Sequence, residues 1–178
     1  HFHDVLIDRF MQTIIYDRDR NITCEVPLEN WVVFTAGPMG AGKSHALHWL
    51  SHRGLFPLHS FVHVDPDSLR ELLPETREYN RRDPSTAGGL TQKEVGYIAE
   101  VMTLLSLEVG KNVVVDGSLR DVVWYRAYFN SLREKFPKMK LAIVHVTAPP
   151  ETVLQRCRRR GLVSLSILSS CVLLSSPE

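Results

Sequence analysis

Short apolar runs alternate with stretches of helical periodicity along this chain. Four apolar runs are typical of strands, at residues 31–36, 61–64, 112–115 and 141–146, and the first and third of them are typical of buried strands. Between and after them, the spacing of apolar residues predicts helices over about residues 43–53, 68–73, 91–109, 121–136 and 150–160. This alternation is typical of βαβ units. We therefore expect an α/β fold of the P-loop NTPase type, a doubly wound parallel sheet with helices on both faces.

Three further segments complete the predicted organisation. Apolar residues at helical spacing in residues 4–17 indicate an amphipathic helix, so residues 1–30 form an N-terminal helical extension. Residues 80–90 are polar and contain Pro, Gly and Ser, which predicts a loop within the 31–160 kinase-like domain. Residues 161–178 form a Ser/Leu-rich tail that departs from the preceding pattern. We expect the C-terminal part to be truncated or altered.

Composition and charge narrow the classes of function. The 178 residues include 21 basic and 20 acidic side chains, for a net charge of +1. This balance gives no reason to expect a DNA or membrane-surface partner. Cys24, Cys157 and Cys171 are far apart and odd in number, so they predict neither a disulfide framework nor a zinc site. The sequence fits a reducing, cytoplasmic location.

A glycine-rich loop carries the strongest chemical signal. Gly37, Gly42, Lys43 and Ser44 match G-x-x-x-x-G-K-[ST], with a predicted strand before and a helix after. In such a loop, backbone amides surround phosphate oxygens, the lysine reaches the β- and γ-phosphates, and the serine hydroxyl binds Mg²⁺. We expect ATP and Mg²⁺ as cofactors. The predicted nucleotide-binding residues are Gly37, Pro38, Met39, Gly40, Ala41, Gly42, Lys43, Ser44 and His45.

Acidic residues follow the second and third predicted strands. Asp65 and Asp67 come after residues 61–64, where ligands of open α/β sheets gather. One of these carboxylates could accept the proton of an attacking hydroxyl. The alternative is a capping role at a helix start, because Ser68 and Glu71 have capping-box spacing. After the third strand, Asp116 has the position of a Mg²⁺-binding or substrate-binding carboxylate.

Arginines provide candidates for contacts with phosphate. Arg120 follows the third strand, and an arginine there can bind phosphate oxygens with two donors. Arg156 and Arg160 lie on the helix after the fourth strand, four residues apart and therefore on one face. Arginines at this place can neutralise charge on a transferring phosphoryl group. The alternative is an exposed basic helix face.

Three motifs, in this order, give the sequence a family resemblance. Gly-Pro-Met-Gly-Ala-Gly-Lys-Ser, Val-Asp-Pro-Asp-Ser-Leu-Arg and Asp-Gly-Ser-Leu-Arg are similar to motifs of the zeta-toxin family of P-loop kinases, over about residues 30–160. The resemblance implies that Asp67 is the general base. It also implies that Glu100, Ser118 and Arg120 contact the substrate, and that Asp116 stands where the family usually has glutamate. The family's acceptor, a sugar hydroxyl of UDP-N-acetylglucosamine, is implied in the same way.

The residues leave other functions open. No Asn-Lys-x-Asp run is present to bind guanine, so a small-molecule kinase is favoured over a GTPase. Another P-loop kinase, acting on a nucleotide, a shikimate-like acid or an RNA end, is the first alternative. The second is a nucleotide-binding interaction module without catalysis, which the unusual tail favours. Lys43, Asp67, Arg120, Arg156 and Arg160 are the predicted catalytic set.

Overall fold

A parallel four-stranded sheet forms the centre of the computed structural model, which describes residues 16–17, 22–23 and 30–159. Its strands are β3 (Trp31–Ala36), β4 (Phe61–Val64), β5 (Asn112–Val115) and β6 (Lys140–His145), in the spatial order β4-β5-β3-β6. Two further short strands, β1 (Tyr16–Asp17) and β2 (Ile22–Thr23), pair antiparallel. The four predicted strands are therefore confirmed, with β6 shifted by one residue. The central strands β3 and β5 are buried, whereas the edge strand β6 has no buried residue.

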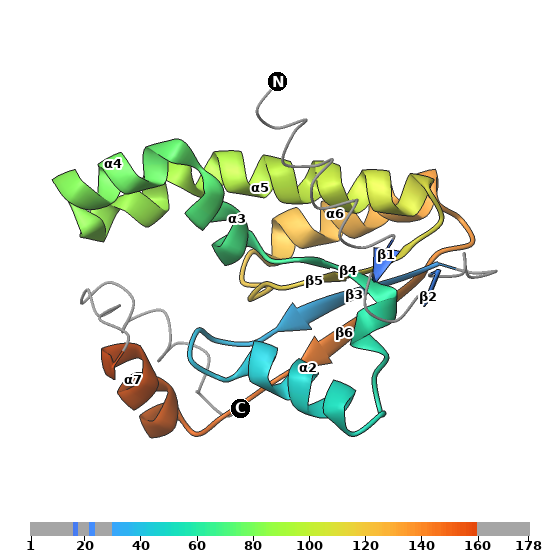
Figure 1. Ribbon diagram of the computed structural model, residues 1–178, viewed down its shortest axis with the longest axis horizontal. Coiled ribbons are helices and arrows are strands. Elements are labelled where there is room, and N and C mark those ends of the chain that lie inside the picture. Colours follow the sequence, from blue (N-terminus) through green and yellow to red (C-terminus); the bar gives the residue numbers. More distant parts are fainter. Residues whose placement is uncertain (1–15, 18–21, 24–29, 160–178) are drawn as a thin grey trace.

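Helices cover both faces of the sheet (Figure 1). The helices of the described residues are α2 (Lys43–His52), η1 (Leu58–Ser60), α3 (Pro66–Leu72), α4 (Pro74–Arg82), α5 (Pro84–Glu108), α6 (Val122–Lys135) and α7 (Pro150–Arg159). In Figure 1, α5 and α6 lie above the sheet and α2 lies below it. The predicted doubly wound α/β fold is confirmed. Among the described helices, none has the length and apolar character that a bilayer crossing requires.

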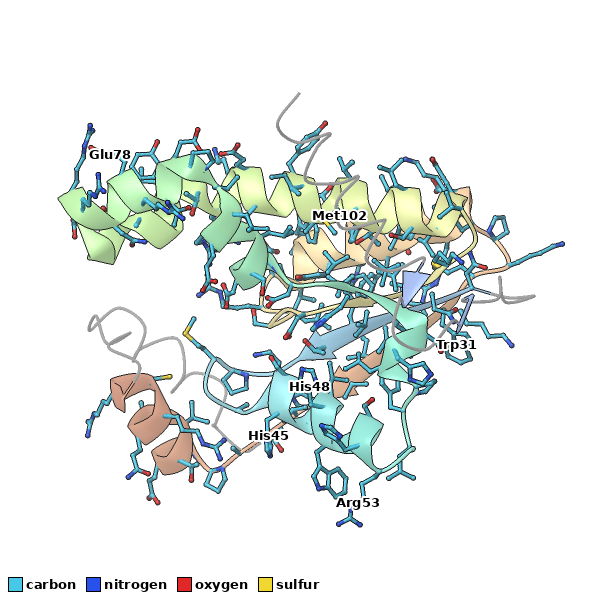
Figure 2. The ribbon with its side chains drawn as sticks, viewed as in Figure 1. Trp31, His45, His48, Arg53, Glu78 and Met102 are labelled. Atoms are coloured by element: carbon cyan, nitrogen blue, oxygen red, sulfur yellow. The ribbon has the colours of Figure 1, made fainter. Side chains whose placement is uncertain are left out.

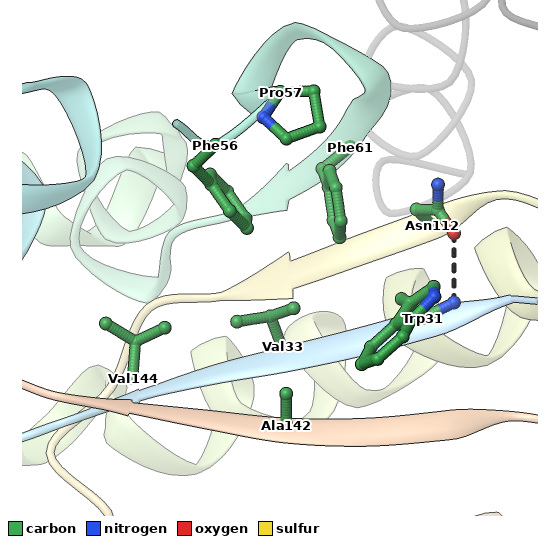
Figure 3. Close-up of a pocket in the computed structure, with 8 residues that line it drawn as sticks. All are labelled: Trp31, Val33, Phe56, Pro57, Phe61, Asn112, Ala142 and Val144. Atoms are coloured by element: carbon green, nitrogen blue, oxygen red, sulfur yellow. Dashed lines mark hydrogen bonds between the residues drawn. The ribbon is translucent and has the colours of Figure 1, made fainter. Parts of the chain in front are cut away.

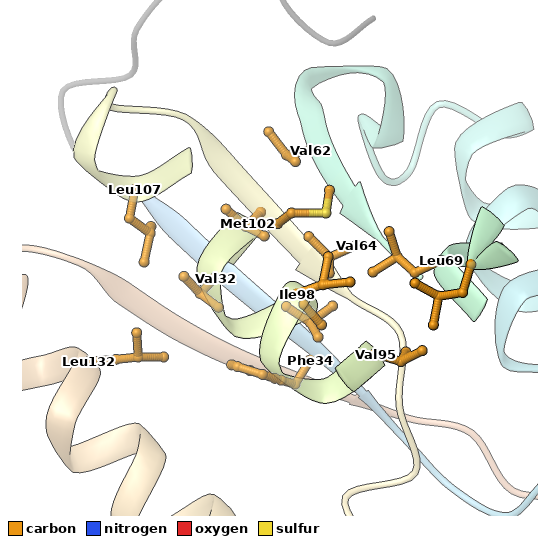
Figure 4. Close-up of a cluster of buried hydrophobic side chains, with 14 residues drawn as sticks. Val32, Phe34, Val62, Val64, Leu69, Val95, Ile98, Met102, Leu107 and Leu132 are labelled. Atoms are coloured by element: carbon orange, nitrogen blue, oxygen red, sulfur yellow. The ribbon is translucent and has the colours of Figure 1, made fainter. Parts of the chain in front are cut away.

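The larger core lies between the sheet and α5 (Figure 4). Val32 and Phe34 of β3 point into it together with Ile98 and Met102 of α5, and each is almost fully buried. Phe34 also packs against the rings of Tyr125, Tyr128 and Phe129 from α6. Since alternate residues of a strand face opposite sides, Val33 belongs to the smaller cluster with Leu47 of α2. Both faces of β3 are thus anchored, which fixes the loop that follows it.

An apolar cavity of about 340 Å³ lies on the α2 side (Figure 3). Its lining includes Trp31, Phe61 and Asn112, the first residues of β3, β4 and β5. The strands are parallel, so these residues mark the end of the sheet at which the strands begin, opposite to their carboxyl ends. The cavity extends from there as far as Val144, the partner of Thr35 in the sheet, and no residue of the predicted phosphate loop lines it.

The prediction of a loop over residues 80–90 is wrong. The helix α4 continues to Arg82, and α5 begins at Pro84 and runs through Gly88 and Gly89. Proline is tolerated in the first turn of a helix, because the amide it lacks has no partner there. Ala87 and Thr91 are buried, so packing outweighs the low helix propensity of the two glycines.

Other helix boundaries differ less from the prediction. The helix expected from residue 68 begins at Pro66, and a further helix, α4, follows at Pro74 where none was predicted. The predicted helix over residues 4–17 is wrong at residues 16–17, which form the strand β1. The rest of that helix and the Ser/Leu-rich tail lie outside the described residues. The division of the chain at residues 30 and 160 stays a prediction.

Candidate nucleotide and magnesium site

The phosphate loop joins the end of β3 to the start of α2. Gly37, Gly40 and Gly42 have φ angles of 129°, 84° and 95°, a region that favours glycine. Gly42 is the N-cap of α2, and no side chain caps the helix there. The first amides of α2 are therefore available to an anion, and the helix dipole favours negative charge at this end.

The backbone of Gly37 approaches another strand connection very closely. A Cβ atom at this position would lie 2.1 Å from the carbonyl oxygen of Val146, which follows β6. We expect Gly37→Ala to destabilise the protein by about 1–3 kcal/mol, since the positive φ and the clash act together. Gly88→Ala is the matched control, because a Cβ added at Gly88 would have no atom within 4 Å. Alanine there should stabilise α5 by about 0.5–1 kcal/mol. Urea unfolding of both variants checks this, and equal effects would contradict it.

Lys43 folds back over the loop. Its Nζ donates hydrogen bonds to the carbonyl oxygens of Gly37 and Pro38, at 3.2 and 3.3 Å. The ammonium group is thus held beside the same backbone that would surround a phosphate. Its charge can interact with phosphate oxygens without a rearrangement of the loop.

Ser44 and Asp116 meet at the end of the loop although 72 residues separate them in the sequence. The Ser44 hydroxyl donates to Asp116 Oδ2 at 2.8 Å. The backbone amide of Asp116 donates to the carbonyl of Val64 at 2.8 Å, so the residue is fixed at the carboxyl ends of the strands. A hydroxyl and a carboxylate are oxygen ligands that suit Mg²⁺, which usually keeps several waters and substrate phosphates.

The donor set around this pair fits magnesium better than a metal held by protein alone. Within the described ranges, no three His, Cys, Asp or Glu side chains come together as a metal cluster. His45 and His48 are exposed on α2 (Figure 2), and so is His52. Ser44 and Asp116 would hold Mg²⁺ only with oxygens from a bound phosphate and from water.

Helix α7 packs directly on the phosphate loop. The Arg156 guanidinium donates to the carbonyls of Gly40 and Ala41, at 3.1 and 3.2 Å. The buried Cys157 contacts the Met39 carbonyl at 3.4 Å through its sulfur. The structure therefore brings Arg156 to the nucleotide site, and its catalytic role stays a prediction. Arg160 lies outside the described residues.

Asp67 lies in the first turn of α3, and its carboxylate is 81% exposed. The cap of this helix is Asp65, which accepts hydrogen bonds from the Asp67 amide at 3.0 Å and the Ser68 hydroxyl at 2.6 Å. Ser68 is therefore not the cap, and the Asp67 side chain is free of a capping role. It forms an ion pair with Arg70 at 2.6 Å instead.

Arg70 is a residue of this region that the sequence did not single out. Besides Asp67, it donates to Thr91 and Gln92 of α5, at 3.1 and 2.9 Å. The arginine thus connects the predicted base to the long helix. Two sequence signals were available: Arg70 ends the Val-Asp-Pro-Asp-Ser-Leu-Arg motif, and it lies three residues after Asp67 on one helix.

The loop after β5 is fastened to the phosphate loop. The Gly37 amide donates to the carbonyl of Ser118 at 3.3 Å. The side chains of Ser118 and Arg120 are exposed on this connection. The structure therefore joins the backbone of Ser118 to the phosphate loop, and the roles of Ser118 and Arg120 stay predictions.

Glu100 lies half-buried on α5, and its negative charge acts on Tyr125 and Tyr128 of α6. Burial raises the pKa of Glu100. Burial also raises the pKa of Tyr125, and the negative charges of Asp121 and Glu100 raise it further. The Tyr125 hydroxyl lies 3.2 Å from where a Cβ of Gly117 would be, so this group extends to the loop after β5.

The raised pKa of Glu100 predicts a pH-dependent effect of Glu100→Gln. Burial penalises the charged form of Glu100 and so lowers the stability of the folded protein. This loss of stability is complete above the pKa of the folded state and absent below the pKa of the unfolded state. The variant should therefore melt at a higher temperature than the parent at pH 7–8. This difference should shrink as the pH falls through the glutamate range. Thermal melts at several pH values check it, and a difference that grows toward low pH would contradict it.

Comparison with known proteins decides the family. The model of the zeta toxin family matches residues 14–167. This chain belongs to the zeta toxin family. The match spans the phosphate loop, both acidic strand ends and α7. No curated protein sequence matches the chain.

A solved structure shares the fold of this zeta toxin family member. A structure from work on the PezAT chromosomal toxin–antitoxin system of Streptococcus pneumoniae superposes with a TM-score of 0.73 at 17% identity. The match covers 90% of this chain and 62% of that one, so this chain spans under two thirds of its length. Shikimate kinase from Acinetobacter baumannii, in complex with shikimate, matches with a TM-score of 0.40 at 21% identity, over 83% of this chain and 74% of that one.

Proposed function

We propose that this protein is an ATP-dependent kinase that transfers a phosphoryl group to a hydroxyl of a small molecule. The observation that carries the proposal is the meeting of Ser44 and Asp116 at the end of a phosphate loop that also holds Lys43. Membership of the zeta toxin family supports it. The first candidate for the acceptor is UDP-N-acetylglucosamine, because the motifs resemble those of that family.

Each side chain has a distinct part in the proposed reaction. The amides of the loop and Lys43 bind the β- and γ-phosphates, while Ser44 and Asp116 hold Mg²⁺. The metal supplies positive charge next to the phosphate oxygens. Arg156, and Arg120 from the neighbouring loop, stabilise negative charge on the transferring group.

Asp67 is the proposed base of the transfer. The acceptor hydroxyl gives its proton to the Asp67 carboxylate, and the oxygen forms a bond to the γ-phosphorus while the bond to ADP breaks. Exposure of Asp67 leaves room for an acceptor, and Arg70 orients its carboxylate. Glu100 and Ser118 are proposed to contact the acceptor. We also propose a cytoplasmic location, in keeping with the buried free thiol of Cys157.

A panel of acceptors tests the proposal. The protein is incubated with Mg·ATP and, in separate reactions, UDP-N-acetylglucosamine, shikimate, nucleosides or an RNA 5′ end, and products are identified by phosphorus NMR. We expect a new phosphate monoester with the nucleotide sugar. A product with another acceptor would keep the kinase and change the substrate. No product with any acceptor, with ATP bound, would favour a binding module instead.

A further inference from the structure

Thr35 is the residue of the site whose chemistry no motif explains. It is the fifth residue of β3, it is fully buried, and only Ala36 separates it from the first glycine of the phosphate loop. A buried hydroxyl in a strand of valines and phenylalanine is costly unless it is hydrogen-bonded. The partners of this hydroxyl therefore indicate why a threonine is present.

The partners of Thr35 belong to the loop that carries Asp116. The Thr35 hydroxyl lies 2.5 Å from Asp116 Oδ1 and 3.1 Å from the carbonyl of Gly117. It accepts a hydrogen bond from the Gly117 amide at 2.9 Å. A hydroxyl has one proton, and the shorter distance and the negative charge both assign it to the carboxylate.

The two oxygens of Asp116 thus have different partners. Oδ1 accepts from Thr35, and Oδ2 accepts from Ser44. We propose that Thr35 is a positioning residue of the magnesium site, which turns the Asp116 carboxylate so that Oδ2 faces Ser44. The inference rests on the proposed function, in which Ser44 and Asp116 hold Mg²⁺. Without the Thr35 hydroxyl, Oδ1 loses its buried donor and the carboxylate is free to rotate.

This arrangement predicts an effect on magnesium rather than on nucleotide alone. Residues that orient a metal ligand affect metal affinity by about 10–100-fold when they are replaced. Without metal, the affinity for ADP depends on the loop amides and on Lys43. The Thr35 hydroxyl bonds to Asp116 and Gly117 and to none of these groups. A structural role alone would weaken ADP binding equally with and without magnesium.

The matched pair Thr35→Ser and Thr35→Ala tests the proposal, because the two variants differ by the hydroxyl oxygen only. Calorimetry measures ADP affinity in EDTA and across a magnesium titration, below the melting temperature of the least stable variant. We expect Thr35→Ala to need about 10-fold more magnesium for the half-maximal effect and Thr35→Ser to stay within about 3-fold of the parent. Thr35→Val, which keeps the side-chain volume, repeats the test if alanine prevents folding.

The outcomes separate this inference from the proposed function. Equal magnesium requirements for the serine and alanine variants, with the parent magnesium-dependent, would overturn the role of Thr35 and leave the kinase intact. An ADP affinity of the parent that does not respond to magnesium at all would overturn the metal site and the inference together.

Discussion

Lys43→Ala is expected to lower the rate of phosphoryl transfer by about 100-fold or more. The variant loses the only side-chain cation that bonds to the Gly37 and Pro38 carbonyls in the described contacts, and with it the charge held over the loop. Loss of one well-placed electrostatic contact to a developing charge costs about 100- to 1,000-fold in rate. Initial rates with Mg·ATP and the best acceptor measure the effect.

Lys138→Ala is the control for Lys43→Ala. Lys138 is exposed in the turn before β6, at the end of the sheet remote from the loop. Its removal changes the net charge equally and should leave the rate within about 2-fold, because exposed charges at long range are largely screened. A Lys43→Ala enzyme as fast as the Lys138→Ala enzyme would show that the loop does not bind the transferring phosphates.

Asp67→Asn is expected to separate binding from transfer. Asparagine keeps the size of the side chain and removes the negative charge that accepts the proton. General-base catalysis contributes about 100- to 10,000-fold, so transfer should fall within that range. Affinity for Mg·ATP should be unchanged, since the Asp67 side chain bonds to Arg70 and not to the loop. Calorimetry and initial rates on the same preparation measure both quantities.

Asp65→Asn is the matched control, with the same chemical change two residues earlier. Asp65 caps α3 by accepting from the Asp67 amide and the Ser68 hydroxyl, and asparagine is an equally good cap. This variant should keep both its melting temperature and its rate. If Asp67→Asn turns over at the normal rate, or if the two variants lose activity equally, Asp67 is not the base.

The fold was largely predictable because its strands are short and apolar, and the two central strands, β3 and β5, are almost completely buried. The wrong prediction of a loop over residues 80–90 has a local cause. Pro84 and the pair Gly88-Gly89 interrupt a helical pattern locally, and only the packing of Ala87 and Thr91 shows that the helix continues through them. Local propensity is a weak guide where tertiary contacts decide.

The candidate site was predictable only in part. A motif with fixed spacing identified Lys43 and Ser44, and the end of an apolar run identified Asp116. The contact between Ser44 and Asp116 depends on β3 and β5 being neighbours, which no local pattern encodes. Thr35 was missed because it acts through a neighbour in space and belongs to no motif. Arg70 is the last residue of the Val-Asp-Pro-Asp-Ser-Leu-Arg motif, but its contacts with Thr91 and Gln92 depend on the packing of α3 against α5.

Transfer of the labelled γ-phosphate of ATP to a small molecule tests the central claim most directly. The full chain and its Lys43→Ala variant are each incubated with labelled Mg·ATP and UDP-N-acetylglucosamine, and then with a metabolite extract. The account predicts a labelled phosphate ester with the parent protein and almost none with the variant. Bound Mg·ATP without any labelled ester, in either mixture, would contradict the conclusion that this protein is a kinase.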